Sequence, residues 1–153
     1  RQFFGETNET VNKKTQAALK AGLATIVCIG ETLQERELGV TNQILADHAQ
    51  NGLSGLSATD MSRVVIAYEP VWAIGTGKTA TPAQAQEAHA HVRGLLKAMF
   101  GPAVADATRI LYGGSVKPEN VKEIMAQPDV DGALVGGASL QADSFEKLIK
   151  FKG

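Results

Sequence analysis

The segment that decides the fold of this chain covers positions 67–78 and reads Ala67-Tyr68-Glu69-Pro70-Val71-Trp72-Ala73-Ile74-Gly75-Thr76-Gly77-Lys78. Its first residues close an apolar, β-branched run, Val64–Tyr68, in which no polar residues alternate. Continuous runs of this kind are typical of parallel strands that are buried on both faces. Glu69 is therefore a carboxylate at the end of a predicted strand, immediately before a glycine-rich segment.

Three further apolar, β-branched runs occur at Ala24–Ile29, Arg109–Tyr112 and Gly132–Val135. The first of them is also continuous, so it too is expected to be buried on both faces. Helical patterns separate them, at Asn8–Ala21 with Gly22 as a C-cap, Leu33–Leu38, Thr41–Gln50, Thr81–Phe100 closed by Gly101-Pro102, Pro118–Ala126 and Ser144–Phe151. Alternation of helices and strands predicts an α/β fold with a parallel sheet and right-handed crossovers. A doubly wound sheet and a (β/α)₈ barrel both fit. Four strands cannot close an eight-stranded barrel, so a barrel needs strands from elsewhere.

Composition indicates an ordinary globular domain of 153 residues, with 44% hydrophobic and 20% charged residues. The net charge of −1 predicts neither a nucleic-acid nor a membrane partner. The first residue is Arg1 rather than Met, so we expect the chain to begin inside a longer one, and no signal peptide is recognisable.

Cys28 is the only cysteine, so no internal disulfide can form, which fits a reducing compartment. It lies within the apolar run Ala24–Ile29. We expect it to be a small buried hydrophobic residue rather than a nucleophile.

Polar and glycine residues follow all four predicted strands, where ligands bind in parallel α/β folds. They are Gly30-Glu31-Thr32, Glu69, Gly113-Gly114-Ser115 and Gly136-Gly137-Ala138-Ser139. Paired glycines let backbone N–H groups approach an anion, which favours a phosphate site, although they also serve tight turns. Glu69 is then a candidate general base, with a structural ion pair to a lysine or arginine as the alternative.

Other motifs give weaker signals. The glycine-rich segment 75–79 departs from the nucleotide-binding motifs because Trp72 and Ala80 occupy required glycine positions, and a mobile lid hinged at Pro70 fits better. His48, His89 and His91 all fall in helical segments, away from the strand ends. No zinc-binding spacing exists, so the histidines are predicted to have surface or packing roles, with no metal and no cofactor.

The segment at positions 67–78 resembles the signature of the triosephosphate isomerase family nearly letter for letter. The resemblance extends along the chain through Cys28-Ile29-Gly30-Glu31, Tyr112-Gly113-Gly114-Ser115-Val116 and Asp131-Gly132-Ala133-Leu134-Val135-Gly136-Gly137-Ala138-Ser139-Leu140. It implies that the strands are the fifth to eighth of a (β/α)₈ TIM barrel. Residues 1–153 would then be four β/α units, the C-terminal half of one barrel domain.

The resemblance also implies roles for individual residues. Glu69 would be the base that moves a proton between two carbons of dihydroxyacetone phosphate and D-glyceraldehyde 3-phosphate through an enediolate. Residues 70–80 would form the lid. The phosphate would be held by backbone amides, namely those of Gly75, Ser115 and Gly137, with Gly136 beside them.

Two further contacts of the lid follow from the resemblance. Glu31 would meet the lid residue Trp72 when the lid is open, and Tyr112 would meet the far end of the lid, near Ala80, when it closes. The family further implies a cytoplasmic homodimer in glycolysis and gluconeogenesis that needs no cofactor.

Important parts of the family pattern do not occur in this sequence. The electrophilic histidine would lie just before Arg1-Gln2-Phe3, and the active-site asparagine and lysine and the dimer-forming third loop would lie earlier still. We therefore expect the chain alone to be inactive and to work with the missing N-terminal half of the barrel. The alternatives are a half-barrel binding or assembly module without catalysis, and another phosphosugar-binding barrel enzyme.

Overall fold

The computed structural model describes residue 1 and residues 4–152. Gln2 and Phe3, which the resemblance aligns with the end of the fourth-strand segment, lie outside the described residues. The strands are β1 (Thr25–Ile29), β2 (Val64–Tyr68), β3 (Ile110–Tyr112) and β4 (Gly132–Ala133). The helices are α1 (Asn8–Lys20), α2 (Leu33–Glu37), α3 (Thr41–Gly52), α4 (Ala58–Met61), α5 (Pro82–Phe100), α6 (Pro102–Ala107), α7 (Val121–Met125) and α8 (Ala142–Ile149), with the 3₁₀ turns η1 (Val71–Ala73) and η2 (Gly137–Leu140).

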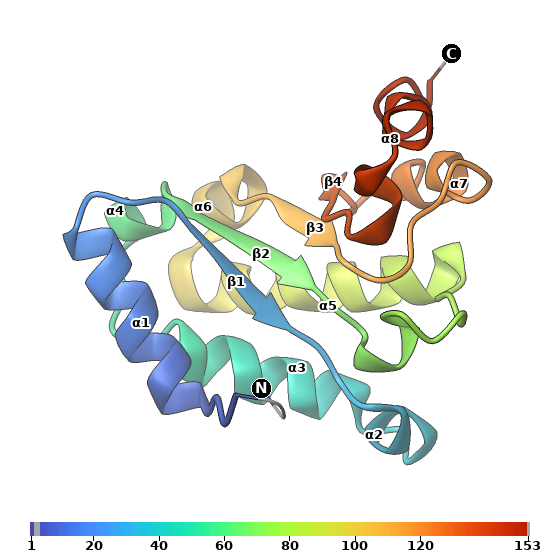
Figure 1. Ribbon diagram of the computed structural model, residues 1–153. Coiled ribbons are helices and arrows are strands. Elements are labelled where there is room, and N and C mark those ends of the chain that lie inside the picture. The colour runs from blue at the N-terminus through green and yellow to red at the C-terminus, as the bar shows by residue number, and fades with distance from the viewer. Residues whose placement is uncertain (2–3, 153) are drawn as a thin grey trace.

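The four strands form one parallel sheet in the order β1-β2-β3-β4, so each strand pairs with the next one along the chain. Figure 1 shows these neighbours with α1, α3 and α5 packed along the sheet. A doubly wound sheet would contain a point where the strand order reverses. Sequential order without reversal is the arrangement of consecutive β/α units in a TIM barrel, so the α/β prediction is confirmed and the chain forms part of such a barrel.

Local sequence signals explain several element boundaries. The Thr81 side chain accepts from the backbone N–H of Gln84, and the Gln84 side chain accepts from that of Thr81, which completes the predicted capping box of α5. Gly22 has a φ of +83° just after α1, as expected of a glycine that ends a helix. α5 does end at Gly101-Pro102, but α6 begins at once at Pro102, because proline suits the first position of a helix.

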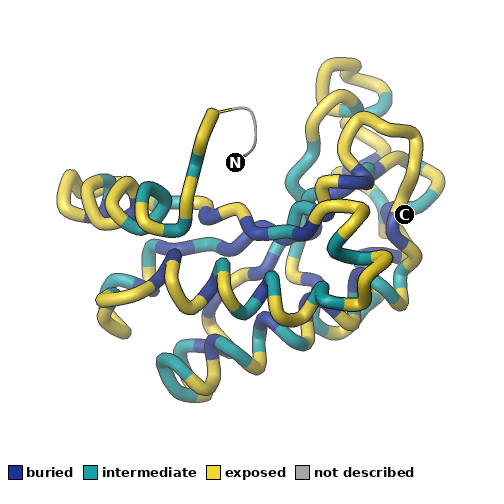
Figure 2. The backbone as a smooth tube through the Cα atoms, turned by 90° about the horizontal axis from the view of Figure 1, so that it is seen from below, coloured by how far each residue is buried: buried dark blue, intermediate teal, exposed yellow. Residues whose placement is uncertain are grey.

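One face of the sheet packs against helices. The strand residues on this face are Val27, Ile29, Ile66, Tyr68, Ile110 and Tyr112, and all are buried. They form one hydrophobic core with residues of α3 and α5, namely Leu45, Ala85, Ala88, Val92 and Leu96. Figure 2 shows the buried backbone concentrated along the strands and the inner turns of the helices.

The opposite face of the sheet is less covered, and here two predictions are wrong. β1 was expected to be buried on both faces, but Ile26 is 50% exposed and Cys28 is also exposed. The helices that contact β1 pack on the face of Val27 and Ile29, and strand residues alternate between faces, so Ile26 and Cys28 are left open.

The Cys28 thiol nevertheless remains protonated near neutral pH. Desolvation by the surrounding sheet and the neighbouring charge of Glu69 raise its pKa to about 11. A thiol in that state is a poor nucleophile, in line with the sequence-based interpretation. Among the described residues, no helix is long and apolar enough to cross a membrane.

Candidate active site

Glu69 directly follows β2, at the end of the sheet where parallel strands present their carboxyl termini. Its backbone N–H donates to the carbonyl of Ile29 with an N···O distance of 2.7 Å. Among the described residues, no lysine or arginine nitrogen lies within ion-pair distance of its carboxylate. The alternative in which Glu69 serves a structural ion pair therefore has no support.

Two glycines let the chain pack closely around Glu69. A Cβ at Gly113 would lie 2.6 Å from Cγ of Glu69, and a Cβ at Gly30 would lie 1.8 Å from its carbonyl oxygen. Carbon atoms in contact normally stay about 3.5–4.0 Å apart. Both positions therefore require glycine for steric reasons, which a turn alone would not demand.

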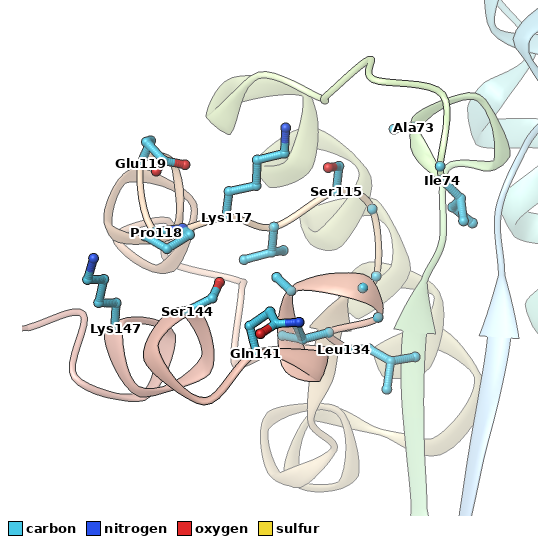
Figure 3. A pocket seen from close by; sticks show the side chains of 18 of the residues that line it. Ala73, Ile74, Ser115, Lys117, Pro118, Glu119, Leu134, Gln141, Ser144 and Lys147 are labelled. Atoms are coloured by element: carbon cyan, nitrogen blue, oxygen red, sulfur yellow. The ribbon is translucent and has the colours of Figure 1, made fainter.

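A cavity of about 1050 Å³ opens beside Glu69 at this rim. Its wall includes Glu69, the lid residues Ile74 and Gly75, and both double-glycine loops, Gly113-Gly114-Ser115 and Gly136-Gly137. Figure 3 shows Ser115, Leu134 and Gln141 among the residues that line it. All five predicted site residues, namely Glu69, Gly75, Ser115, Gly136 and Gly137, thus line one cavity.

Sequence reasoning missed two cations at the same cavity. Lys117 follows the third glycine loop, Lys147 lies on α8, and both line the wall in Figure 3. Lys117 is only two residues after Ser115, so its nearness could have been read from the sequence. Lys147 lies on α8, which follows the fourth glycine loop, and no local pattern indicates that its side chain reaches the same cavity.

The N-terminal end of the lid is fixed by a buried carboxylate. Nε1 of Trp72 donates to Oε1 of Glu31 at 2.9 Å, the Tyr68 hydroxyl donates to the same oxygen at 3.1 Å, and Arg36 pairs with it at 3.1 Å. The Arg36 guanidinium also stacks over the Trp72 ring, 5.0 Å from the centroid. Glu31 is fully buried and does not line the cavity, whereas Glu69 does line it. The two carboxylates that follow β1 and β2 therefore have different surroundings.

The C-terminal end of the lid is fixed by a tyrosine. The backbone N–H of Ala80 donates to the Tyr112 hydroxyl at 3.3 Å, and Ala80 is buried. Residues 74–79 between the two ends are exposed. The resemblance assigns the Trp72 contact to an open lid and the Tyr112 contact to a closed one, and the structure contains both at once.

The amide of Ser115, expected at the phosphate, is already engaged. It donates to the carbonyl of Ala73 at 2.9 Å, which ties the third glycine loop to the lid. Gly75 has a φ of +68°, and Gly137 is the first residue of η2. The three amides thus come from three different loops around one cavity.

The structure separates the three histidines. His91 contacts the carbonyl of Asn42 near the surface, and His89 is fully buried among aromatic rings, as their predicted surface and packing roles require. The prediction that all three lie away from the strand ends is wrong for His48. Its Nδ1 accepts from the N–H of Gly30, just past β1, at 3.4 Å, because α3 packs against that strand.

The strand order, the carboxylate at the end of β2 and the glycine loops around one cavity define the class: a segment of a (β/α)₈ barrel with its candidate site at the carboxyl rim. The family model described as triosephosphate isomerase matches residues 1–152. The chain belongs to the triosephosphate isomerase family.

Curated relatives support this membership. Proteins named triosephosphate isomerase are 58% identical over 153 residues in Trichlorobacter lovleyi, 60% over 152 in Geobacter metallireducens and 61% over 151 in Geotalea uraniireducens. These alignments cover 99–100% of this chain but 60–61% of each relative. The chain therefore spans about three fifths of the length of the curated relatives that it matches.

Proposed function

We propose that this chain supplies the catalytic base, the lid and the phosphate loops of a triosephosphate isomerase, which interconverts dihydroxyacetone phosphate and D-glyceraldehyde 3-phosphate. The observation that carries the proposal is the cavity at the rim, where Glu69 faces the same space as Gly75, Ser115 and Gly137. A carboxylate with no cationic partner in the described part of the chain, next to amides that can hold an anion, is suited to remove a proton from a phosphorylated carbonyl compound.

In this proposal Glu69 removes a proton from the hydroxyl-bearing carbon beside the carbonyl group and returns it to the carbonyl carbon, while the hydroxyl oxygen loses its proton and the carbonyl oxygen gains one. The carbon-bound proton is weakly acidic, so the developing enediolate oxygen must be stabilised by donors aimed at it. Triosephosphate isomerases are a well-known case in which a glutamate base works with a neutral histidine electrophile. None of the three histidines, all of which lie in the described part of the chain, lines the cavity, so in this proposal the missing N-terminal half of the barrel supplies the electrophile.

The loops have a separate task. Phosphate bound at Gly75, Ser115 and Gly137 would provide binding energy remote from the reacting carbons. Lys117 and Lys147 at the cavity wall add positive charge near the negatively charged phosphate group of the substrate. Lid closure would exclude water and strengthen the electrostatic interactions around the enediolate. When the lid closes on substrate, the N–H of Ser115 has to leave the carbonyl of Ala73 and donate to the phosphate instead.

The chain in this proposal is the C-terminal half of one barrel domain. The exposed Ile26 and Cys28 lie on the face that would become the barrel interior, which supports partner strands opposite them. A cytoplasmic homodimer belongs to the same proposal, on the strength of the family alone. The runner-up, a half-barrel module without catalysis, would need no carboxylate at a cavity, and another phosphosugar enzyme would not share positions 67–78.

The test uses a completed barrel, defined as a chimera in which the N-terminal region of the Geobacter metallireducens relative precedes this chain. It should isomerise both triose phosphates and fail to isomerise unphosphorylated dihydroxyacetone at comparable concentrations. Thermal unfolding monitors the fold of the chimera. A cooperatively folded chimera that converts neither triose phosphate would contradict the proposed activity and favour the binding module.

A further inference from the structure

His89, on α5, is an ionisable group with no exposed surface that the proposed mechanism does not use. Its Nδ1 lies 3.2 Å from the carbonyl oxygen of Asp129. A carbonyl can only accept, so Nδ1 carries the proton and Nε2 is the unprotonated nitrogen. Nε2 has no hydrogen-bond partner among the described residues. Desolvation lowers the pKa of His89 to about 4, so the ring is neutral near pH 7.

The ring of His89 contacts two tyrosines. It meets Tyr68 edge-on, with centroids 5.8 Å apart and an interplanar angle of 89°, and it lies 6.4 Å from Tyr112 at 37°. The tyrosine rings are 6.4 Å from each other. Aromatic pairs at these separations attract in edge-on and tilted geometries. The three rings therefore form one cluster between α5 and the sheet.

Each tyrosine holds one end of the lid. The Tyr68 hydroxyl donates to the Glu31 oxygen that also accepts from Trp72, and the Tyr112 hydroxyl accepts from the N–H of Ala80. Burial raises the pKa of both phenols, so both hydroxyls keep their protons. A shift of either ring would change the hydrogen bond at its end of the lid.

The anchor of His89, Asp129, is itself held by hydrogen bonds to side chains of α5. Asp129 accepts from Arg93 at 2.8 Å and from the Gln86 side chain at 2.6 Å, and its N–H donates to Gln86 at 3.0 Å. Gln86 and Arg93 are on α5 together with His89. The bond to the Asp129 carbonyl therefore fixes the orientation of the imidazole relative to both α5 and the segment before β4.

We propose that His89 is a positioning residue that couples the two ends of the lid by holding the Tyr68 and Tyr112 rings in one packed cluster. The coupling is a property of the fold, and only its kinetic consequence rests on the proposed isomerase function. A positioning residue of this kind affects substrate binding and turnover together, because it acts on lid closure rather than on the chemical step.

The experiment compares three variants of the completed barrel. His89→Ala removes the ring, His89→Phe keeps an aromatic ring without the bond to Asp129, and Leu96→Ala is the matched control. Leu96 is also fully buried on α5, two turns further along, so its truncation destabilises the same helix. Backbone hydrogen exchange is followed in peptides covering residues 70–74 and 79–82, and steady-state kinetics are measured in parallel.

The proposal predicts that His89→Ala speeds exchange at both lid ends, whereas Leu96→Ala leaves both at the wild-type rate. In His89→Ala, kcat/KM should fall about tenfold with a rise in KM, and His89→Phe should recover most of the loss. Equal exchange in His89→Ala and Leu96→Ala, a change at only one end, or no recovery in His89→Phe would overturn it. If the wild-type chimera shows no turnover but hydrogen exchange at the two lid ends follows the predicted pattern in the variants, only the proposed function would be contradicted.

Discussion

Glu69 is positioned by its backbone and by neighbouring glycines. Its N–H bonds to Ile29, and the space around its side chain exists because Gly113 has no Cβ. The residue pattern alone placed Glu69 at a strand end and left its role open, whereas the family resemblance implied the role of base. Only the folded structure shows that Glu69 has no cationic partner among the described residues and that it lines the cavity. Both observations weigh against the ion-pair alternative.

Glu69→Asp in the completed barrel should lower kcat by about a hundredfold or more while KM changes little, because the shorter side chain withdraws the carboxylate by roughly 1 Å from the carbon. Steady-state kinetics in both directions provide the measurement. An unchanged kcat would remove Glu69 from the role of base.

Gly113→Ala should impair catalysis because the new Cβ would displace the Glu69 side chain. We expect a loss of activity together with about 1–3 kcal/mol of destabilisation from overpacking. Gly94→Ala is the control, since a Cβ there meets no atom within 4 Å and the position lies inside α5. It should stabilise the protein by about 0.5–1 kcal/mol and leave activity intact. Chemical denaturation compares the two, and equal effects would contradict the steric argument.

The neutral state of His89 predicts a pH dependence of stability. Its pKa is 6.5 in the unfolded chain and about 4 in the fold, so between these values the unfolded state binds more protons. The free energy of unfolding should therefore fall as the pH drops from 6.5 to 4, by on the order of 3 kcal/mol from this group. Around His89 lie Arg93, Asp129 and Asp131 as well as Tyr68 and Tyr112.

Denaturant titrations of wild type and His89→Phe across this range isolate the contribution. His48 also has a pKa lowered by desolvation and contributes in the same direction, but it is present in both proteins. The variant should lose less stability on acidification than the wild type does. Parallel pH curves would show that His89 is not held neutral.

At the scale of elements, boundaries were predicted best where a sequence signal and the packing agree. Val64–Tyr68 matches β2, since the apolar run stops at Glu69-Pro70, and the capping box fixes the start of α5. The short α4 was missed although Ser57 and Asp60 form a capping box, because one turn leaves no periodic pattern. β4 is shorter than predicted, since it pairs only with the three-residue β3.

The lid shows what sequence reasoning could not supply. The resemblance gave its two anchors, Glu31 and Tyr112, but local patterns do not indicate that His89 packs against both Tyr68 and Tyr112. Residues 31, 68, 89 and 112 are far apart in the chain and meet only after the strands align.

The start of α5 supports the adjoining end of the lid. Thr81→Ala removes the side chain that accepts from Gln84 and should cost about 1 kcal/mol of stability. Thr79→Ala, at an exposed position two residues earlier, serves as the control and should stay within about 0.5 kcal/mol of wild type. Thermal or urea unfolding distinguishes them, and a cost below that of the control would contradict the capping assignment.

For the whole molecule, the sequence predicted consecutive β/α units, and the parallel order from β1 to β4 bears this out. It did not predict the open face at Ile26 and Cys28, because an apolar run is the same whether the opposite face is covered by this chain or by other strands. Open sheet edges and exposed apolar residues favour association. We therefore expect the site to be complete only when the other part of the barrel is present.

The most direct test of the central claim follows solvent deuterium into substrate. Dihydroxyacetone phosphate is incubated in D₂O with the completed barrel, with its Glu69→Gln variant and with the 153-residue chain alone, and is analysed by NMR. The completed barrel should introduce deuterium at the carbon that loses its proton, whereas the variant and the isolated chain should introduce none above the buffer rate. Wild-type deuterium incorporation by Glu69→Gln, or catalysed incorporation by the isolated chain, would contradict the account.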